Sequence, residues 1–501
     1  MIALALERPR NLLGRFTMYR LVTLLLLTLV AASFGYAAAG VLLPAIFGLD
    51  AMVLTLVVLV GSSVLADWLL GRVLRVSVQL ESALITGLLL WFLYWPSTQL
   101  STLGWLAVIA ILAQLSKFVI AVHQRHLINP VAAGVVISLI GAHYLPIENF
   151  PYPTWWIANS SLTWLVVLAA VVLWWRTGRF ALAATFVVFA TAFSMISTMS
   201  TGLEFAEAIR FAVVSSPIFF FAGFMLTEPL TLPPRKWQKL AAAALAAVVF
   251  TWPLLSTFLF GEAKQIWVFA STYELTLVIT GLFAFACRQR AGDLELLERR
   301  SLGDDYFEYR FKSVRPVTFE PGQYGEFQVQ HAADLRGKRR MFSFVSTPGE
   351  DVKIAMREPR PGSSFKQALA SATTVRLTSV HGDFLWPKSP QTPLLLVAGG
   401  IGITPFVSQL HEFVDEGRDV VVIHAVHDLS AVPYRDELSA LGVDVHVVLD
   451  KELTVEQIRA KVPDLDRRTA MVSGSPAVVD SLSRGLARHT RSVKIDSFLG
   501  Y

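Results

Sequence analysis

The sequence has little cysteine and little charge for its length. Cys287 is the single cysteine among 501 residues, so the chain contains neither an internal disulfide nor an iron–sulfur cluster held by four of its own thiolates. Charged residues make up 16% of the chain and hydrophobic residues 54%, which is too apolar for a wholly soluble enzyme. The composition therefore predicts that part of the chain lies in lipid.

The few charges divide the chain into two parts. Residues 1–290 contain 17 Lys and Arg against 10 Asp and Glu, whereas residues 291–501 contain 26 and 28. The positive excess belongs to the apolar part, where it indicates membrane orientation, and no basic stripe with interleaved aromatics is present. We expect a transmembrane domain over 1–290, soluble domains after it, and neither a nucleic-acid partner nor a metal site.

The apolar part contains about ten stretches that approach the roughly 20 residues needed to cross a bilayer core of about 30 Å. They are expected near 21–43, 51–71, 82–96, 102–122, 130–147, 160–175, 180–197, 209–227, 239–260 and 266–287. Positive residues fall in every second connection, from Arg8 before the first stretch to Arg290 after the last, which predicts that both termini are cytoplasmic. The prediction is a multi-pass protein of the cell (inner or cytoplasmic) membrane, with the lipid bilayer as a partner.

Ionisable side chains within these stretches are rare. Asp67 and Lys117 lie near predicted cytoplasmic ends, where they could pair or reach the interface, whereas Glu274 lies deeper and could line an ion path or bond a neighbouring helix. A transmembrane haem reductase needs two axial histidine pairs, and this part of the chain has only His123, His126 and His143. We therefore expect no haem in the membrane part.

Two short strings, "HLINPVAAG" at 126–134 and "FMLTEPLTLPP" at 224–234, lie at predicted cytoplasmic helix ends. They resemble the NP-A and M-x-TDP signatures of the ten-span flavin-carrying subunits of the Rnf and Nqr complexes, the Rnf D-subunit and Nqr B-subunit family. The resemblance covers about residues 20–290 and implies that Asn129 and Thr227 help to bind a second flavin, FMN or riboflavin. The alternative is that Asn129 starts one helix and 227–234 ends another.

One departure from that family concerns covalent attachment. The family carries FMN on the Thr of an S/D-G-x-T motif, whereas the matching loop here reads "STMSTGLEF" and has no Thr two places after Gly202. A covalent link is therefore not expected, and a non-covalent flavin stays open. A rival function also stays open, in which the membrane part is a transporter or an anchor.

Two kinds of pattern follow residue 290. Alternating segments such as "YFEYRFKSV" and "YGEFQVQ" predict an antiparallel β-barrel over 291–390. From residue 391 onward, apolar β-branched runs alternate with helical patterns, which predicts an α/β doubly wound domain over 391–501. The predicted fold is thus a polytopic α-helical membrane domain followed by these two domains.

A glycine-rich turn joins a strand to a helix in "LLLVAGGIGITPFVSQL". Its backbone amides can face a pyrophosphate at the helix N-terminus, where Thr404 can cap and Pro405 suits the first turn. The glycines of the turn are Gly399, Gly400 and Gly402.

The order of five further motifs resembles that of the ferredoxin–NADP reductase family over about residues 295–501. The motifs are "RRMFSFVSTP", "PGSSFKQAL", "HGDFLWP", "VSGSP" and "SFLGY". The resemblance implies FAD as the bound cofactor, NADH or NADPH as the electron donor, and hydride transfer between them.

The same resemblance assigns roles on the flavin side. Arg340 would face the flavin phosphates, Phe342 would pack on the isoalloxazine, and Ser343 would hydrogen-bond its N5. Donors for the pyrophosphate would come from Gly362, Ser363 and Ser364.

On the nicotinamide side, Ser473 replaces a frequent Cys of the family, and Gly474 and Pro476 complete that motif. Ser343 and Ser473 are thus the expected catalytic residues. Phe498 and Tyr501 would cover the flavin, and the alternative for these two is a frayed end.

The sequence as a whole predicts a membrane-bound NAD(P)H:acceptor flavin oxidoreductase that passes electrons through FAD to a membrane redox module or acceptor. The acceptor could be a quinone, a flavoprotein or an iron–sulfur protein. His427 and Asp428 stand where an Arg would bind a 2′-phosphate, which favours NADH, while Arg435 leaves NADPH open. The alternative is a transporter or membrane anchor whose reductase domain serves a soluble acceptor.

Overall fold

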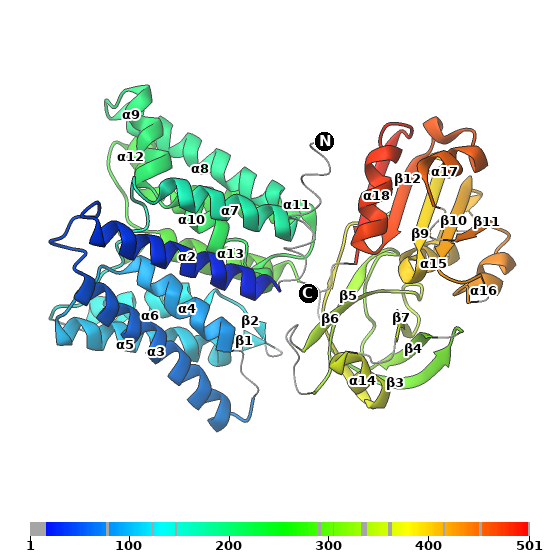
Figure 1. Ribbon diagram of the computed structural model, residues 1–501, viewed down its shortest axis with the longest axis horizontal. Helices are drawn as coiled ribbons and strands as arrows, with labels where there is room; N and C mark the ends of the chain where they lie inside the picture. Colours follow the sequence, from blue (N-terminus) through cyan, green and yellow to red (C-terminus); the bar gives the residue numbers. More distant parts are fainter. Residues whose placement is uncertain are drawn as a thin grey trace. The chain divides into compact units, whose positions relative to one another are not determined.

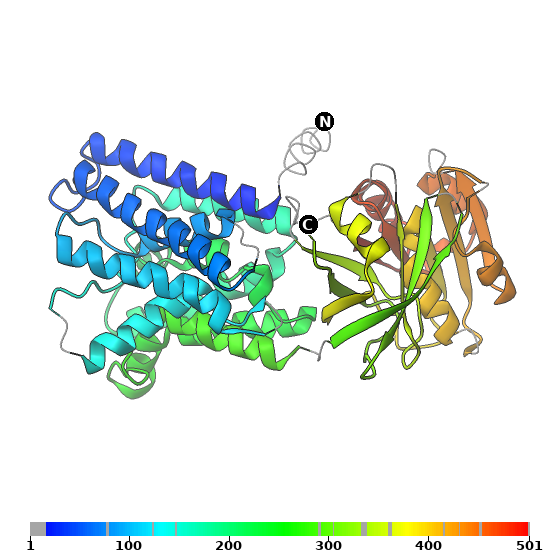
Figure 2. The same cartoon turned by 90° about the horizontal axis from the view of Figure 1, so that it is seen from below.

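The computed structural model describes residues 17–76, 80–122, 125–145, 148–288, 292–303, 305–331, 338–358, 363–413, 416–429, 431–449 and 453–498. The chain divides into two compact units, Met1–Pro233 with Trp237–Cys287, and Pro234–Lys236 with Arg288–Tyr501 (Figures 1 and 2). The predicted domain boundaries at 290 and 390 stay predictions.

The first unit is built from helices. It also contains a short two-stranded antiparallel ribbon, formed by β1 (Ala121–Val122) and β2 (Arg125–His126). The helices are α2 (Met18–Ala38), α3 (Leu49–Val73), α4 (Leu80–Leu93), α5 (Leu100–Val119), α6 (Pro130–Tyr144), α7 (Thr163–Thr177), α8 (Phe180–Ser200), α9 (Phe205–Arg210), η1 (Phe211–Ser215), α10 (Ile218–Phe220), η2 (Phe221–Met225), η3 (Pro229–Thr231), α11 (Lys236–Phe250), α12 (Trp252–Phe260) and α13 (Tyr273–Ala286).

Four of the described helices, α2, α3, α5 and α8, are long and apolar enough to cross a membrane. Two bent pairs raise this number to six if each pair is one span; α9–η1 meets α10–η2 at 44°, and α11 meets α12 at 69°. The apolar helices α4, α6, α7 and α13 have only 14 or 15 residues. At 1.5 Å per residue they reach roughly 21–23 Å, short of a core of about 30 Å, so ten spans stay a prediction.

Small residues allow the helices of the first unit to approach closely. A Cβ added at Gly134 would lie 2.7 Å from the Cβ of Ala113, and one added at Gly223 would lie 2.8 Å from the Cβ of Ala170. Such contacts are typical of helix bundles that lack a hydrophobic driving force between their members. They explain why α6 packs against α5 and why η2 packs against α7.

The second unit begins with a six-stranded antiparallel sheet in the order β6-β5-β8-β3-β4-β7. Its end strands, β6 and β7, meet among the described residues at one bridge, between Phe344 and Ile354, so full closure into the predicted barrel is not confirmed. Alternating aromatic side chains fill its core. The elements are β3 (Gly292–Ser301), β4 (Tyr306–Ser313), β5 (Tyr324–Gln328), β6 (Arg339–Ser343), β7 (Val352–Arg357), α14 (Ser364–Ser371) and β8 (Thr374–His381).

A five-stranded sheet follows, entirely parallel, in the order β11-β10-β9-β12-β13. Leu394 and Leu396 of β9 pack on the face covered by α15 and α16, whereas Leu395 and Val397 pack on the face covered by α17 and α18. The predicted doubly wound sheet is therefore present (Figure 1). Its elements are β9 (Leu394–Gly399), η4 (Gly400–Ile403), α15 (Thr404–Phe413), β10 (Val420–Val426), α16 (Arg435–Ala440), β11 (Asp444–Leu449), α17 (Val455–Lys461), η7 (Leu465–Arg467), β12 (Thr469–Gly474), α18 (Pro476–Leu486) and β13 (Ser492–Ser497).

Candidate functional site

The strand order of the parallel sheet reverses between β9 and β12, and ligands of such sheets bind at the carboxyl ends of the strands beside that point. The glycine turn and the "VSGSP" motif meet there. A Cβ on Gly402 would lie 2.3 Å from the carbonyl oxygen of Ser473, so only glycine fits. Gly400 takes a left-handed φ of 54°, a conformation that glycine adopts more readily than other residues. The two motifs thus form one backbone cradle.

Two polar atoms without partners lie beside this cradle. Ser473 is fully buried, and its Oγ has no hydrogen-bond partner among the described residues. Asp496 pairs with Ser473 across β12 and β13, and its enclosed Oδ2 likewise has none. Burial raises the pKa of Asp496 to about 7. Asp496 can therefore hold a proton near neutral pH.

Asp496 was not predicted from the sequence, because its place beside Ser473 depends on a register between strands 23 residues apart. The next predicted residue, Phe498, is half-buried, and its backbone N–H donates to the carbonyl of Gly474 at 2.9 Å. Pro476 begins α18, which Ser475 caps by accepting from Val478 N–H. Tyr501 lies outside the described residues.

A second residue that the sequence did not reveal is His424 on β10. It is fully buried, and its Nε2 lies 2.9 Å from the carbonyl oxygen of Gly400. A carbonyl only accepts, so Nε2 carries the hydrogen and the ring supports the glycine turn. Burial lowers the pKa of His424 to about 4, so the ring is neutral at physiological pH. Within "VIHAVH" nothing distinguishes this histidine from an ordinary strand residue.

The helix after the glycine turn begins differently from the prediction. Thr404 is the first residue of α15, and its hydroxyl donates to the carbonyl of Ile401 at 3.0 Å instead of accepting from helix amides. Pro405 stands in the first turn, as predicted. The Thr404 hydroxyl therefore links η4 to the start of α15 by a hydrogen bond.

On the first sheet, Arg340, Phe342 and Ser343 lie on β6. The guanidinium of Arg340 lies 5.5 Å from the ring of Phe365 in α14, and one of its nitrogens donates to the carbonyl of Arg339. Ser363 caps α14 by accepting from Lys366 N–H. A guanidinium and a capped helix N-terminus therefore gather in one place, which suits a pyrophosphate.

The aromatic and hydroxyl positions of β6 also fit a flavin. Phe342 is half-buried, and its ring centroid lies 6.0 Å from Phe327 and 5.9 Å from Phe365. Ser343, the next residue, is buried. Ser364 is the first residue of α14, and Gly362 lies outside the described residues. The described donor set matches the phosphate-binding and ring-binding parts that FAD requires.

His427 and Asp428 follow the carboxyl end of β10 and are exposed, as is Arg435 at the start of α16. Their position beyond the sheet edge suits contact with the ribose of a nucleotide. The choice between NADH and NADPH stays a prediction.

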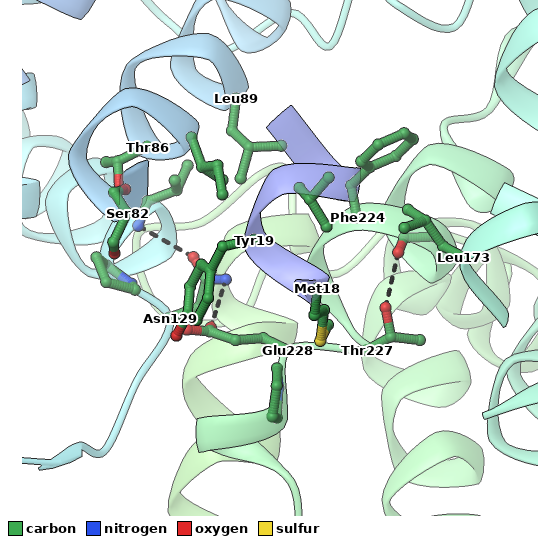
Figure 3. A pocket seen from close by; sticks show the side chains of 16 residues that line it. Met18, Tyr19, Ser82, Thr86, Leu89, Asn129, Leu173, Phe224, Thr227 and Glu228 are labelled. Carbon is green, nitrogen blue, oxygen red and sulfur yellow. Dashed lines mark hydrogen bonds between the residues drawn. The ribbon is translucent and has the colours of Figure 1, made fainter. Parts of the chain in front are cut away.

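The first unit contains a pocket that brings Asn129 and Thr227 together (Figure 3). It encloses about 640 Å³ of space free of protein atoms, its open mouth included. The polar side chains on its wall are Tyr19, Ser82, Thr86, Asn129, Thr227 and Glu228.

Hydrogen bonds hold most of these groups in place. Oδ1 of Asn129 accepts from Val131 N–H at 3.0 Å, as the alternative interpretation of a helix cap predicts, and its Nδ2 donates to Oε2 of Glu228 at 2.9 Å. Oε1 of Glu228 lies 2.6 Å from Nε2 of His126. Thr227 donates its hydroxyl hydrogen to the carbonyl of Gly223 at 2.7 Å, so its oxygen can only accept from a ligand. The pocket is therefore ordered before any ligand binds.

No protein-family model matches the chain. It is 31% identical over 138 residues to a flavohemoprotein of Oceanobacillus iheyensis, covering 25% of this chain and 34% of that protein. It is 28% identical over 209 residues to ferredoxin–NADP reductase B of Sorangium cellulosum, covering 34% and 83%. The flavohemoglobin-like FAD/NAD-binding domain of a nitric oxide dioxygenase from Vibrio cholerae has a TM-score of 0.36 at 15% identity, covering 41% of this chain and 100% of that chain.

The flavohemoprotein and the ferredoxin–NADP reductase confirm the prediction of an NAD(P)H-dependent oxidoreductase for that part of the chain. The chain spans about a third of the length of the flavohemoproteins that it matches. The resemblance to the Rnf and Nqr subunits is not confirmed by these comparisons.

Proposed function

We propose that the chain is a membrane-bound NAD(P)H:acceptor flavin oxidoreductase. Its second unit takes reducing equivalents from NADH, or from NADPH, through FAD, and delivers them to a membrane redox module or to a quinone, flavoprotein or iron–sulfur acceptor. The observation that carries the proposal is the cradle at the reversal point of the parallel sheet, where Gly402 contacts the Ser473 backbone and two unpartnered polar atoms lie. FAD, when bound, accepts a hydride and passes on single electrons.

The residues of the chain supply binding and orientation. Arg340 and the N-terminus of α14 would hold the pyrophosphate of FAD, while Phe342 and Ser343 would contact its ring. Gly400 and Gly402 would leave room for the nucleotide to lie against the protein backbone. Catalysis would then consist mainly of holding the reacting atoms about 3–3.5 Å apart.

A membrane location is supported by the apolar surface of the first unit. On α3 alone, Val57 is 63% exposed, Leu65 56% and Val73 76%. Long apolar faces of this kind are rare on soluble monomers and suit contact with lipid chains. We propose that the first unit lies in the cell membrane with both chain termini cytoplasmic, where NAD(P)H is available.

The pocket of Figure 3 is the proposed site of a second, non-covalent flavin. Its wall is mainly apolar, as ligand pockets usually are, and it includes the π-helical residues Gly223 and Phe224 of η2. The carboxylate of Glu228 on the wall would repel a phosphate group. We therefore favour riboflavin over FMN as its occupant.

One observation keeps the anchor or transporter function as a second candidate. Both ends of the Asn129 side chain are engaged by protein groups, Oδ1 by the start of α6 and Nδ2 by Glu228. A residue that caps a helix in this way needs no flavin to explain it. In that case the reductase unit would serve a soluble acceptor.

A flavin count on the purified full-length protein, before and after acid precipitation, tests the two functions. Two acid-released flavins per chain, both bleached by NADH, would support a redox module in the first unit. One flavin per chain would leave the anchor or transporter, and a colourless protein after reconstitution with FAD would show that the reductase assignment is wrong.

A second experiment addresses the direction of electron flow. Proteoliposomes receive NADH on the side of the reductase unit and enclose an acceptor that cannot cross the bilayer. Reduction of the enclosed acceptor supports transfer through the membrane unit. Reduction only when acceptor and NADH share a compartment supports the anchor.

A further inference from the structure

A carboxyl group is enclosed within the first unit. Glu274, the second residue of α13, is fully buried, and its Oε1 accepts a hydrogen bond of 2.7 Å from the indole Nε1 of Trp155. Its Oε2 is also buried and has no hydrogen-bond partner among the described residues. No described cationic side chain acts on it; its polar interactions are those with Trp155 and with its own backbone. The electron transfer proposed above makes no use of this group.

The Trp155 donor is held in a strained backbone conformation. Trp155 has a φ of 51°, which a residue with a large side chain rarely adopts, and it is only 2% exposed. The backbone amides of Thr154 and Trp155 both donate to the carbonyl of Leu93, at 2.7 and 3.1 Å. Such strain persists only where surrounding contacts over-determine it, and it concentrates at functional sites. This backbone conformation thus places the indole N–H of Trp155 within hydrogen-bonding distance of one oxygen of Glu274.

Hydroxyl groups and aromatic rings lie near Glu274. The hydroxyl of Tyr94 is buried and lies within electrostatic reach of Glu274. Tyr273, the neighbour of Glu274 on α13, stacks on Phe250 at 4.3 Å between ring centroids. Ser138 lies beside Tyr94, and Ser216 lies beside Tyr273. These groups can accept or donate hydrogen bonds, but none supplies a positive charge.

An ionised carboxylate is poorly accommodated in these surroundings. It would be removed from water with the Trp155 indole and its own backbone N–H as donors and with no described counter-ion, a condition under which a buried group takes up a proton. The first turn of α13 favours an anion, but this is a smaller effect than the missing counter-ion. A neutral carboxylic acid avoids this cost, because it carries no charge.

We propose that Glu274 is a proton-binding site of the membrane unit. In the resting protein the proton is bonded to Oε2, while the indole N–H of Trp155 donates to the other oxygen. Release breaks the O–H bond at Oε2, and the proton passes to water. The proposal does not depend on the proposed electron transfer.

Infrared difference spectroscopy on the full-length protein in lipid nanodiscs tests this proposal. At neutral pH the wild type should show the C=O band of a protonated carboxyl group, and the band should shift in D2O. The band should be lost in Glu274→Gln. It should persist in Asp67→Asn, which alters the other buried carboxyl group among the described residues of the first unit, the one that lies 3.9 Å from Lys117.

Three results would overturn the proposal. The first is a C=O band of protonated carboxyl groups that is equal in wild type and Glu274→Gln, since Glu274 would then be ionised. The second is a band that never shifts in D2O, since the proton would not exchange. The third is loss of the wild-type band on adding Na⁺ at constant pH, since the site would then bind a cation. The D2O and Na⁺ measurements are repeated on Asp496→Asn, which removes the protonated carboxyl group of the second unit. They can then be assigned to the first unit even if Glu274→Gln does not fold.

Discussion

The hydroxyl of Tyr434 donates a hydrogen bond of 2.7 Å to Oε2 of Glu308, and this bond joins the two sheets of the second unit. Glu308 lies on β4 of the antiparallel sheet, whereas Tyr434 precedes α16 of the parallel sheet. Tyr434 is 5% exposed and takes a left-handed φ of 62°. Arg300 lies 3.0 Å from Glu308 and 3.4 Å from Glu437, so one network crosses between the lobes. Because hydride transfer depends on sub-ångström placement of two cofactors, we expect this network to affect the reaction.

Replacing Tyr434 with Phe should slow NADH oxidation without removing flavin. The change leaves one oxygen of a buried carboxylate unpaired, which costs about 1–3 kcal/mol of stability. We expect kcat to fall several-fold at unchanged flavin content, measured with an artificial electron acceptor. Tyr309→Phe is the matched control, because it removes a tyrosine hydroxyl that donates to Glu358 and does not join the two sheets. Wild-type kcat in Tyr434→Phe would contradict a positioning role.

Replacing Arg340 with Ala should weaken FAD retention. Hydrogen bonds from a guanidinium to a phosphate contribute about 1.5–3 kcal/mol, so we expect a roughly 10- to 100-fold higher Kd for FAD. Flavin fluorescence after gel filtration measures this loss. Arg310→Ala, on β4 of the same sheet, removes a surface arginine that contacts Glu298 and Asp351 and should retain FAD. Equal retention in both variants would remove Arg340 from the flavin site.

Asp496 should make the second unit less stable as pH rises toward neutrality. Burial raises its pKa from 3.8 to about 7, so between these values the folded chain binds more protons than the unfolded chain. Its contribution to stability is therefore full below pH 3.8 and is lost as pH rises through 7. Asp496→Asn should be more stable than wild type at pH 8 by roughly 2 kcal/mol, allowing for partial solvent access. Chemical denaturation at several pH values measures the difference, and a constant difference across the range would refute the assignment.

His424 should affect the pH dependence of stability in the opposite direction, so that the second unit loses stability as pH falls. Burial lowers its pKa from 6.5 to about 4, so between these values the unfolded chain binds more protons. Stability is therefore lost as pH falls through this window, by about 3 kcal/mol in full. His424→Gln retains an N–H for the Gly400 carbonyl but cannot titrate, so its stability should depend less on pH between 6.5 and 4. A pH profile parallel to that of the wild type would show that His424 is not the titrating group.

The sequence revealed those parts of the site whose residues are neighbours in the chain. Gly399 to Pro405 could be found because a tight turn between strand and helix constrains neighbouring residues. His424 and Asp496 could not be found, because each acts on a residue brought near by the register of parallel strands. Helix positions in the first unit were also predictable, since each expected apolar stretch overlaps a helix or a bent pair. Helix lengths could not be predicted, because apolar composition does not show where an irregular segment, such as the one around Trp155, replaces a turn of helix.

Labelling of single cysteines in membranes should report the orientation of the first unit. Because Cys287 is the only cysteine of the chain, Cys287→Ser gives a background free of thiols. Tyr152 and Trp237 are 63% and 61% exposed, and both lie between expected apolar stretches, so we expect a cysteine at either place to be reached from water. If both termini are cytoplasmic, as the distribution of positive charge predicts, Tyr152→Cys should react with a reagent that stays outside the cell, and Trp237→Cys should react only after lysis. The reverse pattern would put the nucleotide site on the side that lacks NAD(P)H, and the proposed path from cytoplasmic donor to membrane acceptor would then be wrong.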